Sequence, residues 1–163
     1  MNKNTVLGWL EVVKDPEIPV LSLIDLGVIT DVVIEGQHVR VEMTPTFVGC
    51  PAMDYMRKEV IDVLNAHGVQ SPEVNVTLKQ SWSSDHISAK GREALKKFGL
   101  APPPGLNHVI EDIEILEHAV CPRCSSTNTV MRSPFGPTLC RSLHFCNDCK
   151  EAFEQFKPLG EAH

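Results

Sequence analysis

Two cysteine pairs decide the fold of the C-terminal part of the chain: Cys121-Pro122-Arg123-Cys124 and Cys146-Asn147-Asp148-Cys149, with 21 residues between them. Each pair can aim two sulfurs at one ion, and a tetrahedral Zn²⁺ takes four thiolates at about 2.3 Å. The interval slightly exceeds the usual zinc-ribbon spacing, but added loop length has a small entropic cost. We therefore predict a structural zinc site at these four cysteines and a small zinc-ribbon domain at residues 113–163.

The same spacing leaves alternatives open. Two disulfides or a redox-active Cys-x-x-Cys are possible, and thiolates also hold iron–sulfur clusters. The N-terminus, Met1-Asn2-Lys3-Asn4, lacks the apolar run of a secretory signal, and no stretch is long and apolar enough for a membrane span. We therefore expect a soluble cytoplasmic protein, whose reduced cysteines favour metal ligation over disulfides.

The composition suits one or two small globular domains: 163 residues, of which 42% are hydrophobic and 22% charged. The net charge of −6 is uneven, because residues 1–120 carry ten basic and seventeen acidic side chains, whereas residues 121–163 carry five and four. Nucleic-acid binding requires a basic surface that displaces counterions from phosphates. The nearly neutral cysteine module therefore argues against a nucleic-acid partner.

The N-terminal part alternates between helical and strand patterns. Apolar residues at helical spacing predict a helix over Thr5–Val13, which Pro16 ends. The β-branched run Ile29–Glu35, the turn at Gly36 and the alternation over 39–44 predict a hairpin.

A second helix should begin at Pro51 and end before Gly68, with an apolar face of Met53, Met56, Val60, Val63 and Leu64. Alternation over 74–78 predicts a third strand. These elements predict an α+β fold, a small three-stranded sheet with helices on one face, within a domain at residues 1–100.

Residues 88–98 predict a further helix, capped by Ser88, with Ile87, Leu95 and Phe98 available for burial. The run Pro102-Pro103-Pro104-Gly105 then predicts a stiff linker at residues 101–112. In the ribbon, Phe145, Phe153 and Phe156 are the expected core. So small a core should depend on its metal ion.

Cys50 stands apart from the paired cysteines, directly before the second predicted helix. Free N–H groups and the helix dipole stabilise an anion there, and we expect them to lower the pKa of the thiol. Cys50 is then a candidate metal-handling thiolate, with Thr44 and Thr46 as hydrogen-bond donors to its ligand. The alternative is a buried structural thiol, the usual role of a lone cysteine.

Two motifs in this part resemble a known family: Asp15-Pro16-Glu17-Ile18-Pro19 with Asp25-Leu26-Gly27, and Thr44-Pro45-Thr46-Phe47-Val48-Gly49-Cys50-Pro51-Ala52. Over residues 5–80 the chain resembles the metal–sulfur cluster assembly factors, which include SufT-like proteins and the eukaryotic cytosolic iron–sulfur targeting factor. The continuation from Ser81-Trp82-Ser83 through the proline run and the cysteine ribbon looks like one branch, the PaaD-type components of the phenylacetyl-CoA epoxidase (ring-oxygenase) system.

The resemblance implies an accessory role without turnover of its own, the assembly or delivery of an iron or iron–sulfur centre to the epoxidase of aerobic phenylacetate breakdown. It implies the epoxidase subunits and the iron–sulfur assembly machinery as partners, with iron or a cluster held transiently at Cys50. Asp15, Glu17 and Asp25 match the family's acidic motif, although acidic residues beside prolines usually form turns and caps.

Two other functions compete with this one. Cys50 as an enzyme nucleophile would need a base, and the sequence places none nearby, since His38 lies in a strand and His67 lies at the far end of the helix. A stable structural subunit or interaction module would leave both cysteine features chemically inert. We expect Cys140 to be buried and His118 and His144 to lie outside the zinc ligands. Monomer and homodimer both remain open.

Overall fold

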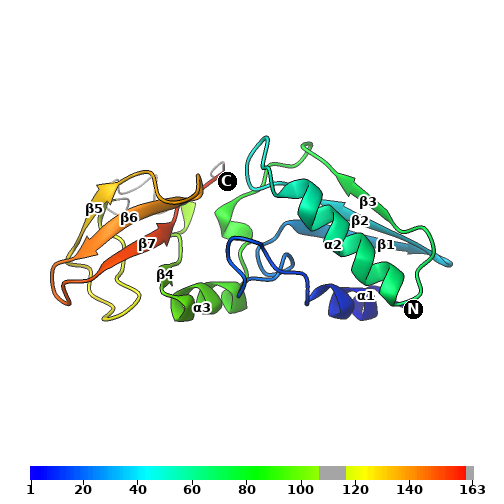
Figure 1. Ribbon diagram of the computed structural model, residues 1–163, viewed down its shortest axis with the longest axis horizontal. Coiled ribbons are helices and arrows are strands. Elements are labelled where there is room, and N and C mark those ends of the chain that lie inside the picture. Colours follow the sequence, from blue (N-terminus) through cyan, green and yellow to red (C-terminus); the bar gives the residue numbers. More distant parts are fainter. Residues whose placement is uncertain (107–116, 161–163) are drawn as a thin grey trace. The chain divides into compact units, whose positions relative to one another are not determined.

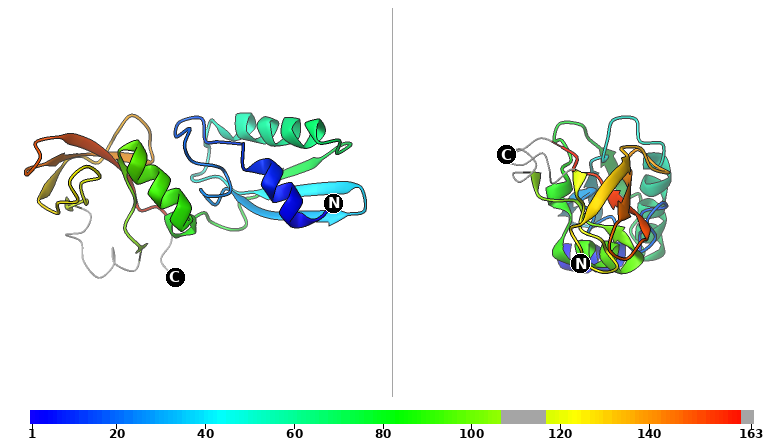
Figure 2. Two further views of the ribbon diagram at one scale, coloured as in Figure 1. Left: turned by 90° about the horizontal axis from the view of Figure 1, so that it is seen from below. Right: turned by 90° about the vertical axis from the view of Figure 1, so that its left-hand side faces the viewer.

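The computed structural model describes residues 1–106 and 117–160 and divides the chain into two compact units, Met1–Trp82 and Ser83–His163 (Figures 1 and 2). Each unit has its own sheet. Within the described residues, no helix has the length and apolar character needed to cross a membrane.

The first unit contains two helices and a three-stranded sheet. Its elements are α1 (Lys3–Leu10), β1 (Ile29–Glu35), β2 (His38–Met43), α2 (Met53–Ala66) and β3 (Glu73–Val76). The strand order is β1-β2-β3, with an antiparallel β1–β2 hairpin and a parallel β2–β3 pair. The helix α1 packs against α2 and β1, and α2 packs against β3 (Figure 1). The predicted α+β fold is confirmed.

Local sequence accounts for most of these elements. Strand β2 alternates as predicted, with Val39, Val41 and Met43 fully buried. Helix α2 buries the predicted apolar face, except that Val63 is only partly covered. Gly68 follows the helix with φ 84°, the left-handed conformation that glycine adopts without strain.

Some predicted ends shift. Helix α1 ends at Leu10 rather than Val13, because the Val13 N–H donates to the Leu10 carbonyl in a turn and Pro16 then prevents helical continuation. Strand β3 ends at Val76, and Leu78 is 62% exposed because the strand no longer pairs there.

The second unit is a four-stranded sheet preceded by a helix. Its elements are the 3₁₀ turn η1 (Ser84–His86), α3 (Ala89–Phe98), β4 (Leu100–Ala101), β5 (Thr129–Ser133), β6 (Arg141–Cys146) and β7 (Ala152–Phe156). The strand order is β4-β7-β6-β5, antiparallel except for the parallel β4–β7 pair. Ser88 caps α3 and Gly99 ends it, as predicted. Phe98, the last residue of α3, is 46% exposed although Leu95 one turn earlier is fully buried, so its predicted burial is wrong.

The division between the units differs from the predicted boundary at residues 101–112. Strand β4 pairs with β7, and this places residues 83–101 with the ribbon. The Arg92 guanidinium donates to the carbonyls of Pro103 and Ser84, so the proline run is fastened to α3 instead of acting as a free spacer. Residues 107–116, which include the rest of the predicted linker and the first residues of the predicted ribbon, lie outside the described residues.

Candidate metal centre and thiol site

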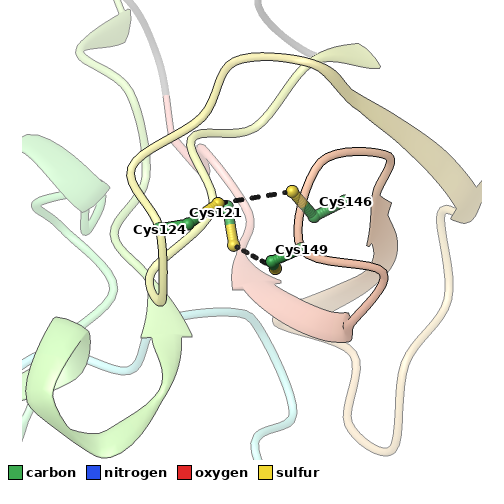
Figure 3. Close-up of side chains that lie close together, drawn as sticks. All are labelled: Cys121, Cys124, Cys146 and Cys149. Atoms are coloured by element: carbon green, nitrogen blue, oxygen red, sulfur yellow. Dashed lines mark hydrogen bonds between the residues drawn. The ribbon is translucent and has the colours of Figure 1, made fainter.

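The four paired cysteines converge on one point in the second unit. The sulfurs of Cys121, Cys124, Cys146 and Cys149 all lie within 4.8 Å of one another. Two of the separations, Cys121 to Cys149 at 3.7 Å and Cys124 to Cys146 at 3.5 Å, join one pair to the other (Figure 3). Sulfurs at 2.3 Å from a tetrahedral ion lie about 3.8 Å apart, so the group fits one metal ion.

The two cysteine turns have the same backbone form. In each, the residue after the second cysteine, Ser125 or Lys150, donates its N–H to the carbonyl of the first, Cys121 or Cys146. Both residues have φ 61°, a left-handed conformation that costs a non-glycine residue about 1 kcal/mol or more. Both cysteine turns have this conformation, and both direct their sulfurs at a common centre.

Polar contacts outside the sulfurs join the turns to each other. The Asp148 carboxylate accepts hydrogen bonds from the Ser126 hydroxyl and, at 3.0 Å, from the Asn128 side chain. These bonds lower the pKa of Asp148, the Ser126 bond more strongly. The Asn147 N–H donates to the Asn128 carbonyl at 2.9 Å. The two halves of the site are therefore held in register by hydrogen bonds as well as by the sulfur group.

The apolar core of the second unit surrounds the sulfurs. Ala101, Ala119, Cys121, Cys146 and Phe153 form one buried cluster, with Cys149 packed against it. Of the three predicted core aromatics, Phe153 and Phe156 are buried and Phe145 is partly buried. The metal site therefore forms part of the core of this unit.

The thiols do not all ionise equally readily. The backbone N–H of Cys149 is the main cause that lowers the pKa of Cys146 to about 7, whereas burial raises the pKa of Cys149 to about 12. Four neighbouring thiolates also repel one another, so a divalent cation is needed to hold them all deprotonated at neutral pH. The donor set and its geometry fit Zn²⁺.

The alternatives to a metal fit less well. All six cysteines are free thiols, and the sulfur separations far exceed the roughly 2.05 Å of a disulfide. His118 contacts the Thr129 carbonyl and His144 contacts the Ser142 hydroxyl, so both rings bond away from the sulfurs. Cys140 is buried, as expected, and its sulfur lies 3.1 Å from the Thr138 hydroxyl.

In the first unit, α2 begins at Met53 rather than at the predicted Pro51, so Cys50 lies in the loop before the helix, two residues ahead of the N-cap residue Ala52. The Cys50 carbonyl accepts the Met53 N–H at 3.2 Å, and the backbone N–H groups of Ala52 and Met53 act to lower the pKa of its thiol. The side chain is partly exposed. Cys50 is therefore neither fully buried nor fully exposed.

The prediction of a lowered pKa at Cys50 is wrong. Burial is the largest influence and raises the pKa, and the carboxylates of Asp15 and Glu17 raise it further by their negative charge. These influences outweigh the backbone N–H groups of Ala52 and Met53, which act in the opposite direction. Cys50 is therefore predominantly a protonated thiol at neutral pH. The sequence showed both motifs, but only folding reveals that Asp15 and Glu17 act on this sulfur.

The acidic motif also has structural roles. Asp15 accepts the N–H groups of Glu17 and Ile18 at 2.8 and 2.9 Å, which closes the turn after α1. Buried Asp25 accepts the Ser22 hydroxyl at 2.9 Å. The Thr44 hydroxyl shares its proton between the carbonyls of Thr77 and Gln80. It is therefore not a donor to a ligand of Cys50.

No base faces Cys50 among the described residues. His38 pairs with Glu73 at 3.1 Å, and the His67 ring stacks on Trp9 beyond the C-terminal end of α2. The groups that act on the Cys50 thiol are carboxylates and backbone N–H groups, with no histidine or lysine. The net effect of these groups is to favour the protonated thiol over the thiolate.

Comparisons with known proteins agree with this two-part organisation. Residues 3–81 match the family described as iron–sulfur cluster assembly protein, and residues 110–157 match the PaaD zinc beta ribbon domain. Both matches confirm the resemblance inferred from the motifs.

Individual relatives cover either the whole chain or its first part. A protein of Escherichia coli (strain K12), provisionally named as one of the subunits of 1,2-phenylacetyl-CoA epoxidase, is 34% identical over 93% of this chain and 90% of its own length. An Fe-S protein maturation auxiliary factor of Porphyromonas gingivalis is 36% identical over 58% of this chain and 88% of its own. The crystal structure of a domain of unknown function from Bacillus anthracis has a TM-score of 0.53 at 32% identity and covers 57% of this chain and 90% of its own.

Proposed function

We propose a function from one premise: the chain belongs to the PaaD-type family, with an iron–sulfur cluster assembly protein domain followed by a PaaD zinc ribbon. It acts as a maturation factor, an accessory protein that helps to assemble or deliver an iron or iron–sulfur centre. Its client is a multicomponent phenylacetyl-CoA epoxidase, and the iron–sulfur assembly machinery supplies the centre. Cys50 binds the iron or cluster transiently, and the four ribbon cysteines hold a structural Zn²⁺.

One observation carries the proposal: the unit that matches the assembly family contains one partly exposed cysteine just before α2, and the carboxylates of Asp15 and Glu17 act on its thiol. The nearby charges of Asp15 and Glu17 favour a cation at this position, as Coulomb's law requires. A ferrous ion that binds there releases the thiol proton to solvent and gains a thiolate ligand. The raised pKa of Cys50 then favours later release of the iron, because the proton competes with the metal.

The ribbon cysteines suit a permanent ion instead. They supply four donors, two of them from buried core residues, and leave no position open on a tetrahedral ion. The two sites therefore differ in how readily they release a bound metal, which is the property that delivery requires.

Metal analysis of anaerobically purified protein tests this division. We expect one zinc per chain in both wild type and Cys50→Ser, with additional iron only in wild type after exposure to ferrous ion. In cells, Cys50→Ser should leave the epoxidase poor in iron and inactive. Cys140→Ala, which removes the other lone thiol, is the matched control. An active client with full iron content in the Cys50→Ser background would refute iron handling by this residue.

The raised pKa of Cys50 favours a second candidate, a stable structural subunit of the epoxidase without iron handling. Purification of the epoxidase separates the two. A stoichiometric complex that survives gel filtration, together with normal iron in the client of Cys50→Ser cells, supports the structural role. Transient association and an iron-poor client support the maturation factor.

A further inference from the structure

A groove of about 520 Å³ crosses one face of the sheet in the second unit, and neither the metal site nor Cys50 uses it. Its lining includes residues from all four strands, Leu100 of β4, Glu154 of β7, Leu143 of β6 and Arg132 of β5, and it ends at Phe98 of α3. These strands lie side by side in Figure 1. The groove therefore lies wholly within one unit.

Strand alternation explains why this face is free. In β6, Ser142, His144 and Cys146 are buried, while Leu143 is 37% exposed; Leu143 lines the groove together with Arg141 and buried His144. Phe98, the aromatic residue whose predicted burial is wrong, lines the same groove at 46% exposure. Two large apolar side chains thus remain in contact with water on a surface that is hollowed and spans the width of the sheet.

The charges in the groove are unbalanced. The Arg141 guanidinium donates to the Glu154 carboxylate at 2.8 Å, so these two charges offset each other. The Arg132 guanidinium lies over the Phe145 ring, 5.2 Å from its centroid, and has no acidic partner among residues 1–106 and 117–160. An arginine whose guanidinium lies over an aromatic ring is attracted to the ring while its N–H groups can still donate to an anion.

We propose that this groove is where the client protein docks, through a segment that carries a carboxylate beside a large apolar side chain. The carboxylate pairs with Arg132, and the apolar side chain covers Phe98 and Leu143. Arginine, aromatic residues and a desolvated apolar centre are the usual anchors of protein interfaces. A single guanidinium on an elongated apolar surface matches an acidic protein segment better than a small phosphate, which takes several converging donors. The identity of the partner as the client rests on the proposed function.

A peptide probe tests the chemistry. A short amidated peptide with glutamates on both sides of a Phe-Leu pair is titrated into the zinc-bound full chain and followed by NMR. We expect the peptide to shift the NMR signals of Phe98, Leu143 and Arg132. The Arg132→Glu and Phe98→Ser variants should bind it at least about tenfold more weakly. A control peptide in which lysines replace the glutamates should not bind. Lys90→Glu, the same charge change in the first turn of α3, should bind like wild type. Equal binding of both peptides, or inorganic phosphate shifting these signals when the acidic peptide does not, would overturn the proposal.

Binding to the client is measured separately from iron transfer. With purified epoxidase, Cys50→Ser should bind like wild type yet leave the client poor in iron, whereas Arg132→Glu should fail at both steps. If Arg132→Glu binds the client normally, or if the wild-type chain does not bind it, the docking proposal is wrong. If the client has its full iron content in Cys50→Ser cells, the proposed maturation role is wrong. The binding of Arg132→Glu to the client still tests whether the groove is the docking site. The NMR spectrum of Arg132→Glu shows whether the ribbon remains folded.

Discussion

The two thiol regions of this protein contain the same chemical group in opposite settings. In the ribbon, four sulfurs lie within 4.8 Å of one another, and two of the cysteines, Cys121 and Cys146, belong to the core of their unit. In the first unit, one partly exposed sulfur lies just before α2, near two carboxylates that raise its pKa. Four converging thiolates suit a metal ion that stays bound, whereas a single thiol near negative charges suits a metal ion that binds and is released again. The predictions below test this contrast, from the largest expected effect to the smallest.

Removal of the ribbon metal should have the largest effect. Chelation, or Cys146→Ser, should abolish the fold of the second unit, because structural zinc contributes on the order of 10 kcal/mol to modules of this size. NMR spectra of the full chain should lose the dispersed signals of β5, β6 and β7 and keep those of the first unit. Cys50→Ser should change neither set. A ribbon that stays folded after complete metal removal would show that its apolar core suffices.

The hydrogen bonds between the two cysteine turns should have the next largest effect. Asp148→Ala removes the acceptor for Ser126 and Asn128 and should weaken zinc binding about tenfold, the lower end of what outer contacts contribute to metal sites. Competition with a chromophoric chelator measures this change. Asp31→Ala is the control, because it removes an aspartate that bonds to Lys3 and Val32 in the other unit. Unchanged zinc affinity in Asp148→Ala would mean that the sulfurs alone set the geometry.

The contrast between the regions also shows what sequence can predict. The cysteine spacing gave the ribbon site, and local patterns gave the hairpin, α2 and the caps at Ser88, Gly68 and Gly99, because each depends on neighbours within a few residues. These features need no knowledge of the rest of the chain.

Features that depend on distant partners were missed. Strand β4 is only two residues long and has no strand pattern of its own; its pairing with β7 moves the division between the units. The pKa of Cys50 was predicted from the helix start alone, but burial and the charges of Asp15 and Glu17 determine its direction. The groove at Phe98 likewise depends on which face of the folded sheet remains uncovered.

Asp15 has both a structural and an electrostatic role, and two substitutions separate them. Asp15→Ala removes the acceptor for two backbone N–H groups and should destabilise the first unit by about 1 kcal/mol. Asp15→Asn retains an acceptor oxygen and removes only the charge, so its stability should remain close to that of wild type. Urea unfolding, followed by the fluorescence of Trp9 and Trp82, measures both. Equal losses in the two variants would mean that the charge itself stabilises the turn.

The smallest effect should be on the titration of Cys50. Because its pKa is raised from 9.0, the thiolate fraction at pH 8 is low and alkylation by iodoacetamide should be slow, accelerating as the pH rises above 9. Removal of one negative charge, in Asp15→Asn or Glu17→Gln, should lower the pKa of Cys50 and increase the rate at pH 8 about twofold. Added salt should speed the wild-type reaction by screening the same charges, and it should affect a variant that combines Asp15→Asn with Glu17→Gln less.

Glu35→Gln provides the control for this titration, because it removes a carboxylate of the same unit that is not among the groups acting on Cys50. Mass spectrometry assigns the alkylated residue, since zinc protects the ribbon cysteines and Cys140 is buried. If neither the variants nor salt change the rate, burial alone raises the pKa. Asp15 and Glu17 would then have only a structural role in the loop, and their charges would not attract a cation to Cys50. The two regions would still differ in the number of sulfurs and in their exposure to solvent.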